Sequence, residues 1–144
     1  MATRSIINLK DDEGTILTIY KHWDGYPQGL GKKLVELKDS IKMINGLTNN
    51  TEDGKIQING FDDFIAYLIW YLKEGVSGDV YINRPIEVKN ITDYWNDYFI
   101  DYVYEINKDL SITCYDATSG KKIDLENILN KNKIIDFNKI EGGK

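Results

Sequence analysis

The sequence predicts a single α+β domain over residues 1–144, in which an antiparallel sheet built from N- and C-terminal hairpins packs against two main helices. Three patterns support this: apolar and polar residues alternate near both ends of the chain, a leucine-rich helical stripe follows the first alternation, and a nearly continuous apolar stretch lies mid-chain. A length of 144 residues allows a buried core without disulfides or metals. We expect the tail, 138–144, to be frayed.

The first predicted hairpin comprises residues 4–10 and 15–22. Its connector, 11–14, is acidic and ends in a glycine, which suits a tight turn. In the second strand, Tyr20 and His22 fall on the same face because side chains alternate along a strand. The loop after this strand therefore begins with a histidine that faces the same way as Tyr20.

A helix is predicted over residues 29–45. Its apolar residues recur at spacings of four and three, which places them along one stripe; they are Leu30, Leu34, Leu37, Ile41 and Ile44. Gly46 stands in the position of a C-terminal cap. A second helix is predicted over 62–74 and is apolar nearly all round, so we expect it at the centre of the core or against a partner.

The segments between these helices and the second hairpin are less regular. Residues 46–60 read as a long polar loop with a short strand at Ile56 and Ile58, and 79–84 read as a strand. For 86–97 a short helix and a loop both remain open.

The second hairpin is predicted from strands 98–106 and 110–116, joined by 107–109. After it, Asp124 is placed to cap a short helix over 125–131.

Composition narrows the function classes. The net charge of −5, from 23 acidic and 18 basic residues, argues against non-specific binding to DNA. Cys114 is the only cysteine, which excludes an internal disulfide and a multi-cysteine zinc site and suggests a reducing compartment. The apolar run 64–72 is too short to cross a bilayer, and 1–10 does not resemble a secretory signal. We therefore predict a cytoplasmic protein that does not bind membranes.

The richest segment is His22-Trp23-Asp24-Gly25-Tyr26-Pro27, followed by Gly29-x-Gly31 at a predicted helix start. Aromatic rings can stack on a base, Asp24 can accept hydrogen bonds from a ribose, and free N–H groups at the helix start can bind phosphate. The match to phosphate-binding motifs is incomplete, since Leu34 replaces a third glycine. The predicted ligand-binding residues are Arg4, His22, Trp23, Asp24, Tyr26, Gly29, Gly31, Lys32 and Arg84.

Other interpretations of the same segment stay open. It can be a structural turn, with Asp24 as a helix cap and Trp23 in the core. His22 can also act as a general base, but no serine or cysteine lies in a recognisable nucleophile setting. Cys114 reads as a small buried thiol. We therefore assign no catalytic residue and predict no metal site and no cofactor.

The N-terminal segment carries a resemblance to a protein group. It reads Thr3-Arg4-Ser5, then an acidic glycine turn, then Ile19-Tyr20-x-His22-Trp23-Asp24-Gly25-Tyr26-Pro27-x-Gly29-x-Gly31 and a leucine-rich helix. This pattern resembles small uncharacterised accessory proteins of phages, prophages and archaeal viruses. In that group a cysteine commonly precedes the histidine, where this chain has Lys21. The resemblance implies a viral protein that acts against host defence, in the cytoplasm of the infected or lysogenic cell.

Three functions follow as hypotheses. The first is binding and sequestration of a nucleotide-type host immune signal, such as a cyclic nucleotide or a cyclic ADP-ribose-like molecule, without turnover. The second is an acidic protein–protein inhibitor of a host defence nuclease, similar to anti-CRISPR proteins. The third is a small hydrolase that uses His22 and Asp24. The apolar second helix also predicts a homodimer or higher oligomer.

Overall fold

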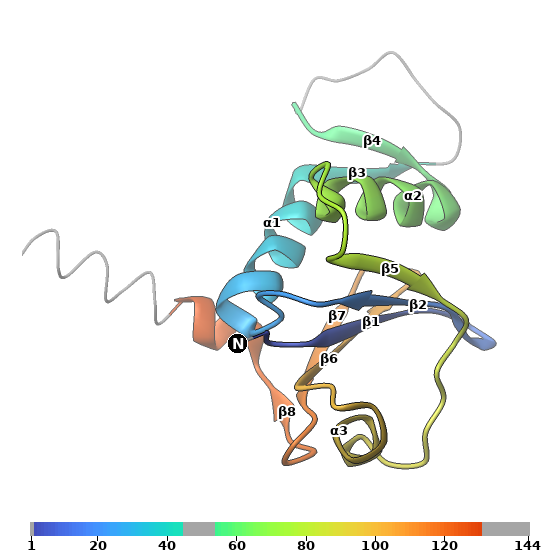
Figure 1. The fold of residues 1–144 in the computed structure, drawn as a ribbon. Helices are drawn as coiled ribbons and strands as arrows, with labels where there is room; N and C mark the ends of the chain where they lie inside the picture. Colours follow the sequence, from blue (N-terminus) through green and yellow to red (C-terminus); the bar gives the residue numbers. More distant parts are fainter. Residues whose placement is uncertain (1, 45–53, 131–144) are drawn as a thin grey trace, which may run out of the picture.

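The computed structural model describes residues 2–44 and 54–130 (Figure 1). Its main sheet has six strands in the order β5-β2-β1-β6-β7-β8. These strands are β1 (Ser5–Asp11), β2 (Gly14–Lys21), β5 (Val80–Asn83), β6 (Tyr102–Asn107), β7 (Ile112–Asp116) and β8 (Lys122–Ile123). A small parallel sheet contains β3 (Ile41–Ile44) and β4 (Ile56–Asn59). The helical elements are the π-helical turn η1 (Pro27–Gly31), α1 (Lys32–Ser40), α2 (Gly60–Lys73) and α3 (Thr92–Tyr98).

Both predicted hairpins form, as β1–β2 and β6–β7, and the α+β class is confirmed. The expected antiparallel arrangement holds within each hairpin, but the sheet as a whole is mixed, because one strand pair is parallel. The hairpins join through the parallel pair β1–β6, with Ser5 opposite Tyr102. A parallel pair needs a long crossover, and the helices between β2 and β6 supply one. Residues 5–9 are buried on both faces, as expected for a central strand with a parallel neighbour.

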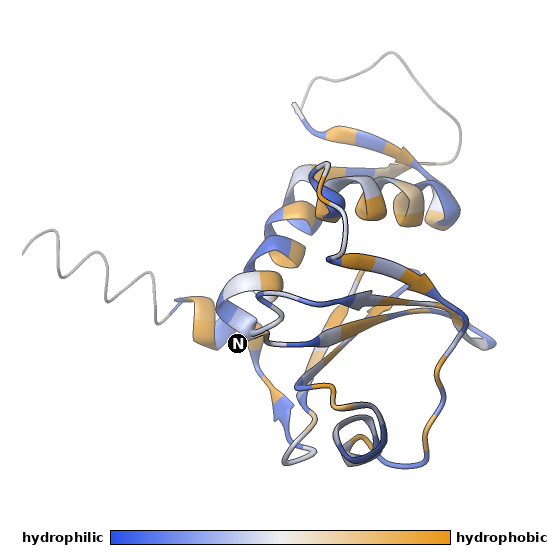
Figure 2. Cartoon of the chain, in the orientation of Figure 1, coloured by the Kyte–Doolittle hydropathy of each residue, from blue (hydrophilic) through white to orange (hydrophobic). Residues whose placement is uncertain are grey.

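The sheet separates two hydrophobic clusters. Ile7 and Ile19 belong to the larger cluster, with residues of α1 and α2, whereas Ile6 and Val103 belong to the smaller one, with Tyr94 of α3. The helices accordingly cover opposite faces of the sheet in Figure 1. Figure 2 shows hydrophobic residues recurring along β5 and α2, which lie close together. Successive side chains of β1 thus pack into different hydrophobic clusters on the two faces of the sheet.

The predicted helix over 29–45 is shorter than expected. It starts as η1, continues as α1 to Ser40, and the chain then becomes strand β3. Ser40 Oγ donates to the Leu37 carbonyl at 2.9 Å, and Ile41 takes an extended conformation. β3 pairs with β4, so the apolar residues after Ser40 form strand contacts, which suit β-branched side chains better than a helix does. The proposed cap, Gly46, lies outside the described residues.

The other elements lie near their predicted positions. α2 and β5 match the second helix and the strand at 79–84, and β4 includes the expected short strand. In the open segment 86–97 the chain forms α3, which continues to Tyr98, so the strand predicted over 98–106 begins later, at Tyr102. Asp124 Oδ1 accepts from the Asn127 N–H at 3.1 Å, as a helix cap does. Residues 45–53 and the tail 131–144 lie outside the described residues, and within the described ones no helix is long and apolar enough to cross a membrane.

Candidate functional site

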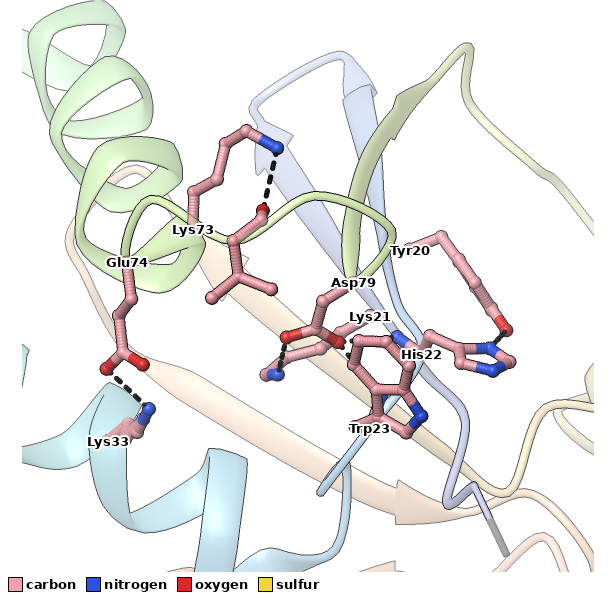
Figure 3. Close-up of polar contacts among 9 residues, drawn as sticks. Tyr20, Lys21, His22, Trp23, Lys33, Lys73, Glu74 and Asp79 are labelled. Atoms are coloured by element: carbon pink, nitrogen blue, oxygen red, sulfur yellow. Dashed lines mark hydrogen bonds and ion pairs between the residues drawn. The ribbon is translucent and has the colours of Figure 1, made fainter.

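The loop after β2 is attached to the loop between α2 and β5 by one carboxylate (Figure 3). Asp79 Oδ1 accepts hydrogen bonds from the backbone N–H groups of His22 (3.2 Å) and Trp23 (2.9 Å). Asp79 Oδ2 contacts Lys21 Nζ at 2.5 Å. The His22 N–H also donates to the Asp79 carbonyl at 2.9 Å. The first residues of the loop therefore have a fixed backbone position.

The Lys21–Asp79 pair is buried, with exposed side-chain fractions of 5% and 12%. Burial raises the pKa of Asp79, but the hydrogen bonds from Lys21 and from the Trp23 and His22 backbone outweigh it and leave this pKa below its ordinary value. Asp79 is thus ionised near neutral pH. Lys21 in turn neutralises the charge of this carboxylate.

The middle of the loop is held by close backbone packing. The Gly25 N–H donates to the Thr3 carbonyl at 2.9 Å, and the Tyr104 hydroxyl donates to the Gly25 carbonyl at 2.7 Å. A Cβ at Gly25 would lie 2.5 Å from Ser5 Oγ and 2.7 Å from the Thr3 carbonyl oxygen. Position 25 therefore requires glycine for close approach.

The helix start does not present free donors to a phosphate. The Gly29 N–H donates to the Tyr26 carbonyl at 2.9 Å, and the Leu30 N–H donates to the Asp24 carbonyl at 3.0 Å. Burial raises the pKa of the Tyr104 hydroxyl, and the nearby Gly31 backbone opposes that increase. Gly31 itself is buried, and a Cβ there would meet Leu125 at 2.9 Å. Close packing therefore accounts for glycine at positions 29 and 31.

A recess lies beside the loop, at the β2–β5 edge of the sheet. Its volume is about 400 Å³, and it is lined by Tyr20, His22, Gly78, Tyr81 and Asn83. Tyr20 and Tyr81 are direct cross-strand partners, with ring centroids 6.0 Å apart at 41°. The lining thus combines two phenol rings, an imidazole and an amide on one face of two paired strands.

One polar contact and one nearby charge define the chemistry of the recess. The Tyr20 hydroxyl lies 2.7 Å from His22 Nδ1. Burial raises the pKa of Tyr20, while the positive charge of nearby Arg4 opposes that increase. Arg4 is held in place through its backbone, which donates to Asp101 Oδ2 at 3.0 Å. A guanidinium charge therefore acts on the hydroxyl that contacts the imidazole.

The predicted ligand-binding residues separate into two sets. His22 lines the recess, Arg4 acts on Tyr20, and Arg84 is exposed one position after Asn83. Arg4 and Arg84 do not line it themselves, and neither do the remaining six. They are Trp23, Asp24, Tyr26, Gly29, Gly31 and Lys32.

The residues of the second set have other surroundings. Trp23 is 43% exposed, so it does not fill the core, and its ring meets that of His22 at 5.1 Å. Asp24 is exposed, and it is not a helix cap, because Tyr26 occupies the cap position of η1 without a side-chain bond. Lys32 Nζ lies 4.0 Å from Glu36, and both side chains are 59% exposed.

Sequence reasoning missed Tyr81, Asn83 and Asp79 as partners of this loop. The shared face of Tyr20 and His22 was visible in the alternation, but the pairing of β5 with β2 was not, because it links distant segments. Cys114 is buried as predicted, and burial raises its pKa to about 12. Among the described residues no cluster of His, Cys, Asp and Glu could hold a metal ion.

Comparisons with known proteins add no assignment: no protein-family model, no curated protein and no solved structure matches this chain.

Proposed function

We propose that the protein binds a small nucleotide-type ligand in the recess beside His22 and does not convert it. The observation that carries the proposal is the lining itself, with two phenol rings, an imidazole and an amide around about 400 Å³. Small-molecule sites have volumes of this order and combine aromatic faces with a few polar groups. The ligand class is the host signal named above, a cyclic nucleotide or a cyclic ADP-ribose-like molecule.

Each lining group has a suitable partner on such a ligand. The rings of Tyr20 and Tyr81 offer faces on which a base can stack. The Asn83 amide supplies one acceptor and two donors for the edge of a base. The Tyr20 hydroxyl lies 2.7 Å from His22 Nδ1, and the second ring nitrogen, Nε2, can exchange a hydrogen bond with the ligand. The charge of Arg4 favours an anionic ligand.

Binding without turnover is favoured over hydrolysis by the surroundings of His22. Its Nδ1 contacts a phenol, whereas a general base is usually oriented by a carboxylate. Asp24, the carboxylate of the hydrolase hypothesis, does not line the recess. The described lining residues include no serine, threonine or cysteine that could act as a nucleophile.

Calorimetry with cyclic dinucleotides, cyclic trinucleotides and cyclic ADP-ribose isomers tests the proposal. We expect at least one to bind, and Tyr81→Ala to weaken that binding about tenfold or more through lost stacking. Ile82→Ala is the matched control, because Ile82 is the next residue of β5 and does not line the recess. The bound ligand should be recovered intact after long incubation.

Two results would overturn the proposal. One is that none of the panel binds at concentrations on the order of tens of micromolar. The other is that Ile82→Ala weakens binding as much as Tyr81→Ala does, which would place the ligand elsewhere. Chemical conversion of the ligand would support the hydrolase hypothesis instead.

A further inference from the structure

A second group of aromatic side chains lies exposed at the end of α3, away from the recess lining. It contains Trp95, Tyr98 and Phe99, which we name the α3 aromatic surface; they are 38%, 48% and 60% exposed. The rings of Trp95 and Phe99 meet edge to face at 6.4 Å. The helix is anchored from its other side by Tyr94, whose hydroxyl donates to the Ile86 carbonyl at 2.7 Å. These three rings are therefore displayed by a fixed helix.

The backbone of Phe99 adds an independent observation. Its φ is +59°, in the left-handed region that favours glycine at a helix end. The helix is closed by the N–H groups of Phe99 and Ile100, which donate to the carbonyls of Trp95 and Tyr94 at 3.0 Å each, and a glycine could do the same. Backbone strain at a residue whose side chain does not serve the core is a reason to look for function.

Leu110 also has a positive φ, but unlike Phe99 it has a buried side chain. Its φ is +69°, but its side chain is only 7% exposed and belongs to the larger hydrophobic cluster, which offsets the strain. The Phe99 side chain is 60% exposed and has no comparable burial. The fold therefore gains little from a phenyl ring at position 99.

The charge of α3 indicates which chemistry suits these rings. The helix carries Asp93 and Asp97 and no basic residue, and Asp101 follows shortly after it. Asp97 is exposed between the aromatic positions, and the chain as a whole has a net charge of −5. Ring faces attract cations, and carboxylates pair with guanidinium groups, so the surface is complementary to arginine. It is repulsive to phosphate.

We infer that the α3 aromatic surface binds an arginine-bearing segment of another protein. Arginine fits better than lysine because its planar guanidinium stacks on rings while it bonds to a carboxylate. Exposed aromatic side chains on a rigid element are also typical of the residues that dominate binding energy at protein interfaces. None of its three rings lines the recess, and the inference does not depend on the ligand proposed there.

Fluorescence anisotropy with a labelled octa-arginine peptide, in physiological salt, tests the inference. We expect Phe99→Gly to weaken binding about tenfold while the protein stays folded, since a lost cation–π contact is worth that much when desolvated. Asp97→Asn should weaken binding and reduce its salt dependence. Octa-lysine should bind more weakly than octa-arginine. Tyr98→Ala repeats the test at a position with no backbone strain.

Matched controls separate this surface from general acidity. Asp62→Asn removes the same charge from α2, and Trp70→Ala removes a 69% exposed ring there; both should bind octa-arginine like the unmodified protein. Equal affinity of Phe99→Gly, Tyr98→Ala and the unmodified protein would overturn the inference. Equal loss in Asp62→Asn and Asp97→Asn would also overturn it, because binding would then follow net charge alone. Failure of these tests leaves the recess proposal untouched.

Discussion

The loop 22–31 and the end of α3 each contain a non-glycine residue with positive φ, but different contacts hold the two regions in place. Asp24 has φ +57° and Phe99 has φ +59°, and each lies among exposed aromatic side chains. The loop is held by distant residues, namely the Asp79 carboxylate, the Thr3 carbonyl and the Tyr104 hydroxyl. The end of α3 is closed by its own backbone. Contacts with the rest of the fold therefore hold the loop in its conformation, whereas the Phe99 side chain makes no comparable contribution to the core.

This difference predicts that substitutions at the contacts that hold the loop lower stability, whereas substitutions at the end of α3 change binding without a loss of stability. The largest expected effect is at Asp79. Asp79→Ala leaves Lys21 buried without a partner and the N–H groups of His22 and Trp23 without their acceptor, so the free energy of unfolding should fall by about 3–5 kcal/mol. Urea denaturation followed by tryptophan fluorescence measures it.

Two controls sharpen this result. Glu74 pairs with Lys33 near the same loop, but that pair is exposed, so Glu74→Ala should leave the unfolding free energy unchanged within error.

Because the pKa of Asp79 is lowered in the folded state, the stabilising contribution of this carboxylate is complete above its ordinary pKa and is lost as the pH falls through the lowered one. The difference between the unmodified protein and Asp79→Asn should therefore shrink in acid. A difference independent of pH would contradict the role of the charge.

The anchoring of the loop also marks the limit of what the sequence predicts. Alternation placed β1, β2 and β7 correctly but began β6 too early, at Tyr98, which is the last residue of α3. The shared face of Tyr20 and His22 followed from the same pattern. Local patterns carry no information about which strands pair across long stretches of chain. The partner strand β5, with Tyr81 and Asn83, and the parallel pair β1–β6 therefore appeared only in three dimensions.

The glycines of the loop also show what the sequence alone does not predict. Gly29-x-Gly31 before a helix is typical of a phosphate site, because the pattern implies free N–H groups. Here the N–H groups of Gly29 and Leu30 bond to carbonyls within the loop, and Gly31 packs against Leu125, a residue far along the chain. A glycine that allows close packing and a glycine that admits a ligand are identical in sequence. Only their neighbours separate them.

An intermediate effect is expected at Gly25. A methyl group there would lie 2.7 Å from the Thr3 carbonyl oxygen, and backbone cannot move aside as a flexible side chain can. Gly25→Ala should lower the free energy of unfolding by about 1–3 kcal/mol. Cys114, buried with its pKa raised to about 12, should then react faster with a thiol reagent because the protein opens more often. Unchanged stability and labelling would mean that the loop is not held at Thr3.

The smallest effects on stability are expected at the two residues with positive φ, Phe99 and Asp24. Glycine relieves the left-handed conformation, worth about 1–2 kcal/mol, but costs about 0.5–1 kcal/mol of backbone entropy and the edge contact with Trp95. Phe99→Gly should therefore leave the free energy of unfolding unchanged or raise it by up to about 1 kcal/mol. The free energy of unfolding should rise less in Asp24→Gly, because aspartate tolerates positive φ better than phenylalanine does. Thermal and urea unfolding of both variants measure the contrast. A clear loss of stability in Phe99→Gly would mean that its ring supports the fold, and the distinction between the two regions would fail. Unchanged or raised stability would leave binding as the remaining reason for a phenylalanine at that position.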